Sequence, residues 1–75
     1  MFEKKYPNLS WWMNNQGWIE LGSKQEGEPC WLTVYDAEMP ELAYEDDASK
    51  SLEAALRRAE KWTAKKINEE FDIYL

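Results

Sequence analysis

Residues 51–71 have the sequence SLEAALRRAEKWTAKKINEEF, and this stretch decides the fold that we predict for the chain. Apolar and small side chains recur along it at steps of three and four residues: Leu52, Leu56, Ala59, Thr63, Ile67 and Phe71, with Ala55 and Trp62 beside them. This spacing places them on one face of an α-helix. Ser51 is suited to be the N-cap, because its hydroxyl can accept from a free N–H of the first turn. We therefore predict one long amphipathic helix that ends near Phe71, with Ile73 and Leu75 loosely docked.

Three short segments before this helix have the composition and alternation of β-strands. They are Trp18–Leu21, Cys30–Tyr35 and Leu42–Glu45, and polar turns separate them. The third segment is the weakest, and the pattern leaves its register open. Together they predict a three-stranded antiparallel meander, which needs a helix over one face to be stable by itself.

A short helix is predicted before the strands, from about Leu9 to Gln16. Asn8 is suited to be its N-cap, and Gly17 is suited to be the left-handed residue that closes it. So short a helix is unstable alone, so three side chains at helical spacing are expected to dock it: Leu9, Trp12 and Met13. The chain is thus expected to be a single α+β domain over residues 1–75, with the order helix, three strands, helix.

The alternation gives the predicted sheet two different faces. One face is expected to pack under the long helix as the core, and it carries Ile19, Leu21, Leu32, Val34 and Leu42. The other carries Trp18, Trp31, Thr33 and Tyr35, and Trp11 of the short helix is expected to join them. An exposed group of aromatic side chains is typical of a binding surface. Alternatively the short helix lies across this face and hides it, and the sequence leaves both alternatives open.

Composition narrows the classes of function. The 75 residues carry a net charge of −6, no His and a single cysteine, Cys30. The charge argues against non-specific binding to nucleic acid or to an anionic membrane. No apolar run approaches the ~20 residues that span a bilayer, no signal-peptide pattern is present, and one cysteine allows neither an internal disulfide nor a Cys-based metal site. We therefore expect a cytoplasmic protein with no cofactor, no bound metal and no membrane partner.

We do not expect an enzyme, and we assign no catalytic residue. A nucleophilic Cys30 would lack a His as its base, and a small open sheet offers no deep pocket to shift the pKa of carboxyls such as Glu20 and Asp36. The acidic run between Asp36 and Asp47 has no calcium-loop spacing, and no Gly-rich phosphate loop is present. We interpret this acidic run, and the basic middle of the long helix, as solvated faces that partly complement each other.

Two motifs carry a resemblance to a known family. Residues 6–12 have the pattern Tyr-Pro-Asn-Leu-x-Trp-Trp, residues 17–22 are Gly-Trp-Ile-Glu-Leu-Gly, and a less specific Ser-Leu-Glu-x-Ala-Leu follows at 51–56. In these the chain resembles a small bacterial, mainly cyanobacterial, family of uncharacterised proteins. It departs from that pattern at residues 37–40, where the family would have a Gly-rich turn. The resemblance implies no activity and no site residues.

The expected function is protein–protein interaction or self-association through the aromatic face. The partner is an unknown protein or a second copy, and the chain is expected to be a monomer or a weak homodimer. The first alternative is a nucleic-acid-related module, since the double-stranded RNA-binding domain has the same order of elements. Such domains need a basic cluster at the start of the last helix, where this chain has Ser51, Leu52 and Glu53. The second alternative is an acidic regulator that mimics DNA.

Overall fold

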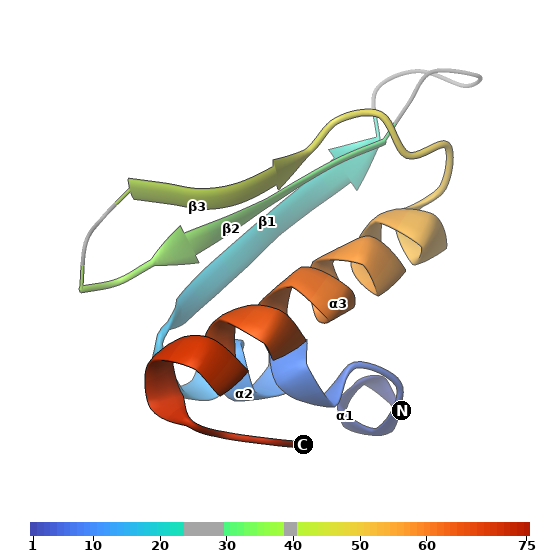
Figure 1. Cartoon of the computed structure of the whole chain (residues 1–75). Coiled ribbons are helices and arrows are strands. Elements are labelled where there is room, and N and C mark those ends of the chain that lie inside the picture. Colours follow the sequence, from blue (N-terminus) through green and yellow to red (C-terminus); the bar gives the residue numbers. More distant parts are fainter. Residues whose placement is uncertain (24–29, 39–40) are drawn as a thin grey trace.

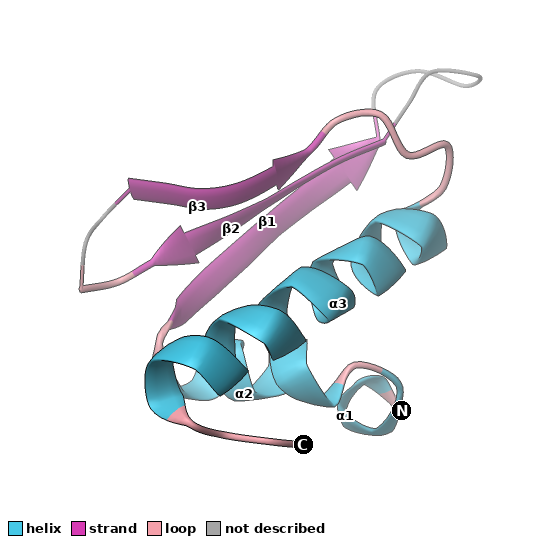
Figure 2. Ribbon diagram, in the orientation of Figure 1, coloured by secondary structure: helices cyan, strands magenta, loops and turns pink. Residues whose placement is uncertain are grey.

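Two short helices, three strands and one long helix follow each other along the chain: α1 (Phe2–Lys5), α2 (Pro7–Asn15), β1 (Gly17–Ser23), β2 (Cys30–Asp36), β3 (Glu41–Asp46) and α3 (Leu52–Phe71). The structure is a computed structural model that describes residues 1–23, 30–38 and 41–75. The strands form an antiparallel sheet in the order β1-β2-β3. All three helices lie on the same side of this sheet (Figure 1), and Figure 2 shows how α3 runs along it. The predicted α+β fold is confirmed.

Helix α3 starts as its sequence predicts. The Ser51 hydroxyl accepts a hydrogen bond from the Ala54 N–H at 3.1 Å, which satisfies a donor of the first turn. The side chains that α3 buries completely or nearly so follow a strict spacing of four residues: Ala55, Ala59, Thr63 and Ile67. Small residues at the first two positions let the helix lie close to the sheet.

The end of α3 is set by a left-handed residue. Asp72 has φ of 56°, and the next N–H, that of Ile73, donates to the Ile67 carbonyl at 3.2 Å. Ile73 then packs against the core, whereas Leu75 is 62% exposed. The predicted docking of the last residues is therefore confirmed for Ile73 and wrong for Leu75.

Helix α2 is capped by a side chain from α3. Its first residue is Pro7, so the predicted N-cap Asn8 lies inside the helix. The Glu60 carboxylate accepts hydrogen bonds from the N–H of Asn8 at 3.0 Å and from that of Leu9 at 2.9 Å. A negative charge is favourable at this end of a helix. The Asn8 prediction is wrong because the cap comes from 52 residues away in the sequence.

Gly17 has a different role from the predicted one. It starts β1, pairs with Asp36, and its φ lies outside the left-handed region. A Cβ at this position would collide with the Tyr35 carbonyl oxygen and lie 3.0 Å from the Trp12 Nε1. That Nε1–H donates to the same carbonyl oxygen at 2.9 Å. Glycine is therefore needed here because the Tyr35 carbonyl of β2, which accepts from the Trp12 indole, lies too close for a side chain.

The core lies between the sheet and the helices. Its buried apolar members are Tyr6, Leu9, Trp12, Leu32, Val34, Ala55, Ala59 and Ile67. Leu9 and Trp12 dock as predicted, but Met13 is 37% exposed. Leu21 was expected in the core and is 40% exposed, because β1 is an edge strand and α3 lies mainly over β2. The predicted core side chain of Leu42 lies outside the described part of the structure.

The structure also supplies the register that the sequence left open. Val34 pairs with Tyr44 and Thr33 with Glu45, and a bulge follows, so that Tyr35 pairs with Leu42. Leu32 and Val34 are completely buried on the side of α3. The predicted orientation of the sheet is therefore confirmed.

Candidate interaction surface

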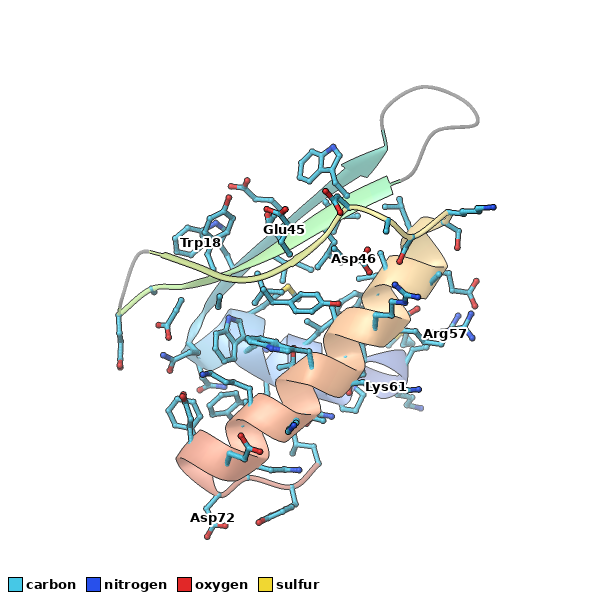
Figure 3. The ribbon with its side chains drawn as sticks, turned by 45° about the horizontal axis from the view of Figure 1, so that its top comes forward. Trp18, Glu45, Asp46, Arg57, Lys61 and Asp72 are labelled. Carbon is cyan, nitrogen blue, oxygen red and sulfur yellow. The ribbon has the colours of Figure 1, made fainter. Side chains whose placement is uncertain are left out.

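The side of the sheet that faces away from α3 carries aromatic and acidic side chains from all three strands. The register pairs Trp18 with Tyr35, Glu20 with Thr33, Gly22 with Trp31, and Thr33 with Glu45. Directly paired residues share a face, and neighbours along a strand alternate. We call this surface the outer face, and its described side chains are Trp18, Glu20, Trp31, Thr33, Tyr35 and Glu45. In Figure 3, Trp18 and Glu45 point away from α3, whereas Asp46 points toward it.

One end of the outer face is an aromatic stack. The rings of Trp18 and Tyr35 are nearly parallel, at 13°, with centroids 5.0 Å apart. Trp18 is 41% exposed and Tyr35 is half-buried. The stack therefore holds the Trp18 ring in place while it leaves much of the ring open to a partner.

The other end of the outer face is the indole of Trp31, which lies across Gly22 of the neighbouring strand. A Cβ at Gly22 would lie 2.7 Å and 2.9 Å from two atoms of that indole, Cζ2 and Cε2. The missing side chain lets the ring lie close to the backbone of β1. Trp31 is half-buried as a result, and it forms a second aromatic platform on the same face.

Two exposed carboxylates lie between these platforms. Glu20 on β1 and Glu45 on β3 flank Thr33 on the central strand. Two strand spacings separate their backbones by ~10 Å. None of the ion pairs found among the described residues involves Glu20 or Glu45. The outer face therefore combines apolar rings at both ends with negative charge in the middle.

Trp11 does not belong to this face, contrary to the sequence-based expectation. Its ring lies 5.3 Å from that of Phe71, near the end of α3. The reason is the position of α2: Trp12 is completely buried in the core under the sheet, so α2 is held on the side of α3. Of the two alternatives for the aromatic face, the structure therefore shows the open one: no helix among the described residues covers it.

Three features of this surface were not among the predicted site residues: Glu20, Glu45 and the contact of Trp31 with Gly22. Alternation already assigns Glu20 to the face of Trp18. Glu45 needed the register of β3, which the pattern left open. The contact of Trp31 with Gly22 joins residues on different strands, and neither residue alone indicates it.

Asp46 lies next to Glu45 in sequence but belongs to the interior. It is 6% exposed and accepts hydrogen bonds from the Ser49 hydroxyl at 2.7 Å and from the N–H of Ala48 and of Ser49, both at 3.1 Å. Burial would raise the pKa of the Asp46 carboxyl, but these hydrogen bonds and the Arg58 guanidinium outweigh it and lower that pKa. Asp46 therefore fixes the link between β3 and α3.

The predicted acidic run is thus only partly a solvated face. Besides Asp46, the Asp36 carboxylate serves the fold, since its Oδ1 accepts from the Gln16 amide and from the Glu38 N–H. The acidic run was also expected to complement the basic middle of α3. Among the described residues, one ion pair joins the two, that of Arg58 with Asp46 at 4.0 Å.

Other kinds of site have less support. Arg57, Arg58 and Lys61 line a hollow of about 240 Å³ on α3, which is smaller than typical small-molecule pockets of ~300–1,000 Å³. Within residues 1–23, 30–38 and 41–75, no three His, Cys, Asp or Glu residues gather as metal ligands would. No helix in the same ranges combines the length and apolarity needed to cross a membrane.

Comparison with known proteins identifies no relative of this chain. No protein-family model, curated protein or solved structure matches the chain. The resemblance to a bacterial family stays a prediction.

Proposed function

We propose that this chain is a protein-interaction module and that its outer face is the contact surface. The observation that carries the proposal is the Trp18 ring, 41% exposed and held by its stack on Tyr35. Aromatic side chains dominate interface energetics because they bury a large area at a small cost in side-chain entropy. The proposal places this interaction in the cytoplasm, where a chain with one cysteine is ordinary.

A partner protein and a second copy are both compatible with this function. The stack of Trp18 on Tyr35 limits the rotamers of the ring before binding, so less entropy is lost when the face is covered. The Trp31 ring, which packs against Gly22, is a second ring with restricted rotamers on the same surface. The size of the protein at increasing concentration separates the two occupants.

The proposal is tested by affinity capture from a lysate of the organism that makes the protein. Wild type is compared with Trp18→Ala, Trp31→Ala and the control Phe71→Ala, since Phe71 is 36% exposed but lies on α3. Wild type and Phe71→Ala are expected to capture the same protein, and the two outer-face variants to lose it. Far-UV circular dichroism checks that all four are folded. Equal capture by all four would show that the outer face is not the contact surface.

Binding to nucleic acid is the second candidate, and one observation favours it. Arg57, Arg58 and Lys61 lie together on α3, and Figure 3 shows Arg57 and Lys61 away from the outer face. Against it, Arg57 already pairs with Glu53 at 3.4 Å and Arg58 lies 4.0 Å from Asp46. A mobility-shift assay at low salt tests this candidate, and a shift that Arg57→Gln and Lys61→Gln abolish would support it over protein binding.

A further inference from the structure

We propose that the outer face binds a basic segment of a partner protein, with an arginine side chain seated between the two aromatic platforms. This inference rests on the proposed function and specifies the chemistry of the partner. It commits to a cationic segment, as opposed to a second copy of the chain or an apolar surface.

The charge of the outer face is the first argument. All of its described ionisable groups that are charged at neutral pH are carboxylates, those of Glu20 and Glu45. The whole chain, these two carboxylates included, has a net charge of −6. Interfaces match opposite potentials, and a mismatch costs affinity. The face therefore selects a positively charged partner.

The rings are the second argument, and they favour arginine in particular. A guanidinium group is planar, stacks on aromatic faces, and is attracted by the negative face of an indole. Thr33 lies at the centre, two residues along β2 from Trp31 on one side and from Tyr35 on the other. Two residues of a strand span ~7 Å. An arginine over Thr33 is thus within reach of a ring on either side and of the Glu20 and Glu45 carboxylates.

The same charges disfavour a second copy. Two outer faces brought together would bury Glu20 and Glu45 of one copy near those of the other, and such like-charge contacts cost several kcal/mol. A head-to-tail contact would instead use Arg57 or Arg58 of α3, both of which already lie near carboxylates of their own chain. Contacts of that kind form rings or open chains of molecules, which sedimentation detects.

The probe is a fluorescein-labelled peptide of alternating glycine and arginine. Its counterpart has citrulline in place of arginine, which keeps the shape and removes the charge. Binding to the full chain is measured by fluorescence anisotropy at low salt. We expect the arginine peptide to bind and the citrulline peptide to bind at least tenfold more weakly, roughly as two exposed cation–π contacts would give.

Matched variants separate this site from general attraction to an acidic protein. Glu20→Gln combined with Glu45→Gln removes two charges from the outer face, and Glu3→Gln combined with Glu69→Gln removes two exposed charges outside it. The first pair is expected to weaken binding roughly tenfold, as the loss of two exposed ion pairs at low salt gives, and the second less than about twofold. Trp18→Ala should also weaken binding, by about two- to fivefold at unchanged charge, as the loss of one exposed cation–π contact gives, whereas Phe71→Ala should not change it.

Each outcome decides the proposal. Equal losses in the two double variants, equal binding of the citrulline peptide, or full binding by Trp18→Ala would overturn it. Full binding by Trp18→Ala would also show that the carboxylates alone attract the peptide, as the acidic surface of a DNA mimic would. Growth in size with concentration that Trp18→Ala abolishes would assign the face to a second copy. If the arginine peptide fails to bind while capture from the lysate still depends on Trp18, the inference is wrong and the proposed function stands.

Discussion

Aromatic rings stack on both sides of the sheet, but the structure holds them differently. Under α3, Tyr44 stacks on Trp62 at 5.1 Å, and Trp62 meets Trp12 edge-on at 5.7 Å. These rings come from three different elements, and Trp12 is completely buried. On the outer face, Trp18 stacks on Tyr35 of the adjacent strand only.

The comparison shows that the position of an aromatic side chain, more than its type, decides its role. A tryptophan packed between another helix and the sheet, such as Trp12, loses all of its surface to the fold and contributes to stability. A tryptophan held by one neighbouring strand keeps surface that a partner can still bury. Substitutions on the two faces should therefore separate stability from binding, and four experiments test that separation.

The largest expected effect is that of Trp12→Ala. Truncation of a buried tryptophan costs ~3–5 kcal/mol, and here it also leaves the Tyr35 carbonyl without its indole donor. Trp18→Ala is expected to cost less, ~1–2 kcal/mol, because the ring is 41% exposed and packs on Tyr35 alone. Urea unfolding followed by circular dichroism measures both. Similar losses of stability for the two variants would contradict the division between the faces.

The second effect concerns the connection between the helices under the sheet. Glu60→Ala removes the carboxylate that caps α2, and we expect it to lower the free energy of unfolding by ~2 kcal/mol, as for hydrogen bonds to a charged group. Glu69→Ala, an exposed glutamate of the same helix, is the control and should change stability by less than ~0.5 kcal/mol. Urea titration compares the two. If they are equally stable, the Glu60 contact does not hold α2.

The third effect is the pH dependence that Asp46 brings to the covered face. Because its pKa is lowered in the folded state, it contributes stability above the unfolded value of ~3.9, and this contribution is lost as the pH falls further. Asp46→Asn should therefore cost ~1 kcal/mol at pH 7 and less at pH 3. Thermal unfolding at the two pH values measures the difference. A constant gap between variant and wild type would show that the charge of Asp46 is unimportant.

The smallest effect is a gain. Asp72 is in the left-handed region and places a negative charge at the C-terminal end of α3, and both are unfavourable. Asp72→Gly should stabilise the protein by ~0.5–1 kcal/mol, and Asp72→Asn by less, because it removes the charge and keeps a side chain. The melting temperature reports both. The peptide affinity of the outer face should be unchanged in either variant.

The sequence predicted which side chains share a face of a helix or strand, because the periodicity of the pattern determines this. The spacing of four in α3 and the spacing of two in β2 each place side chains on a face, and the structure confirms both faces. What it could not predict depends on contacts between distant segments. The Glu60 cap on α2 is one case, and the position of Trp11 beside Phe71 is another, because each follows from how α2 packs.

The candidate surface shows the same limit. Trp18, Trp31, Thr33 and Tyr35 lie on one face as predicted, because strand alternation alone decides this. Whether that face is open depended on which side of the sheet α2 takes. The burial of Trp12 settles that choice, and no local pattern distinguishes a tryptophan that enters the core from one that covers a sheet.

The Glu60 cap has a consequence for the order in which the chain acquires structure. Helix α2 has nine residues, too few to persist in isolation, and the group that satisfies its first N–H donors is supplied by α3. During synthesis the amino-terminal residues leave the ribosome first, yet they must wait for the last third of the chain. Helix α2 is translated before the sheet and before α3, and it is therefore among the last parts to fold.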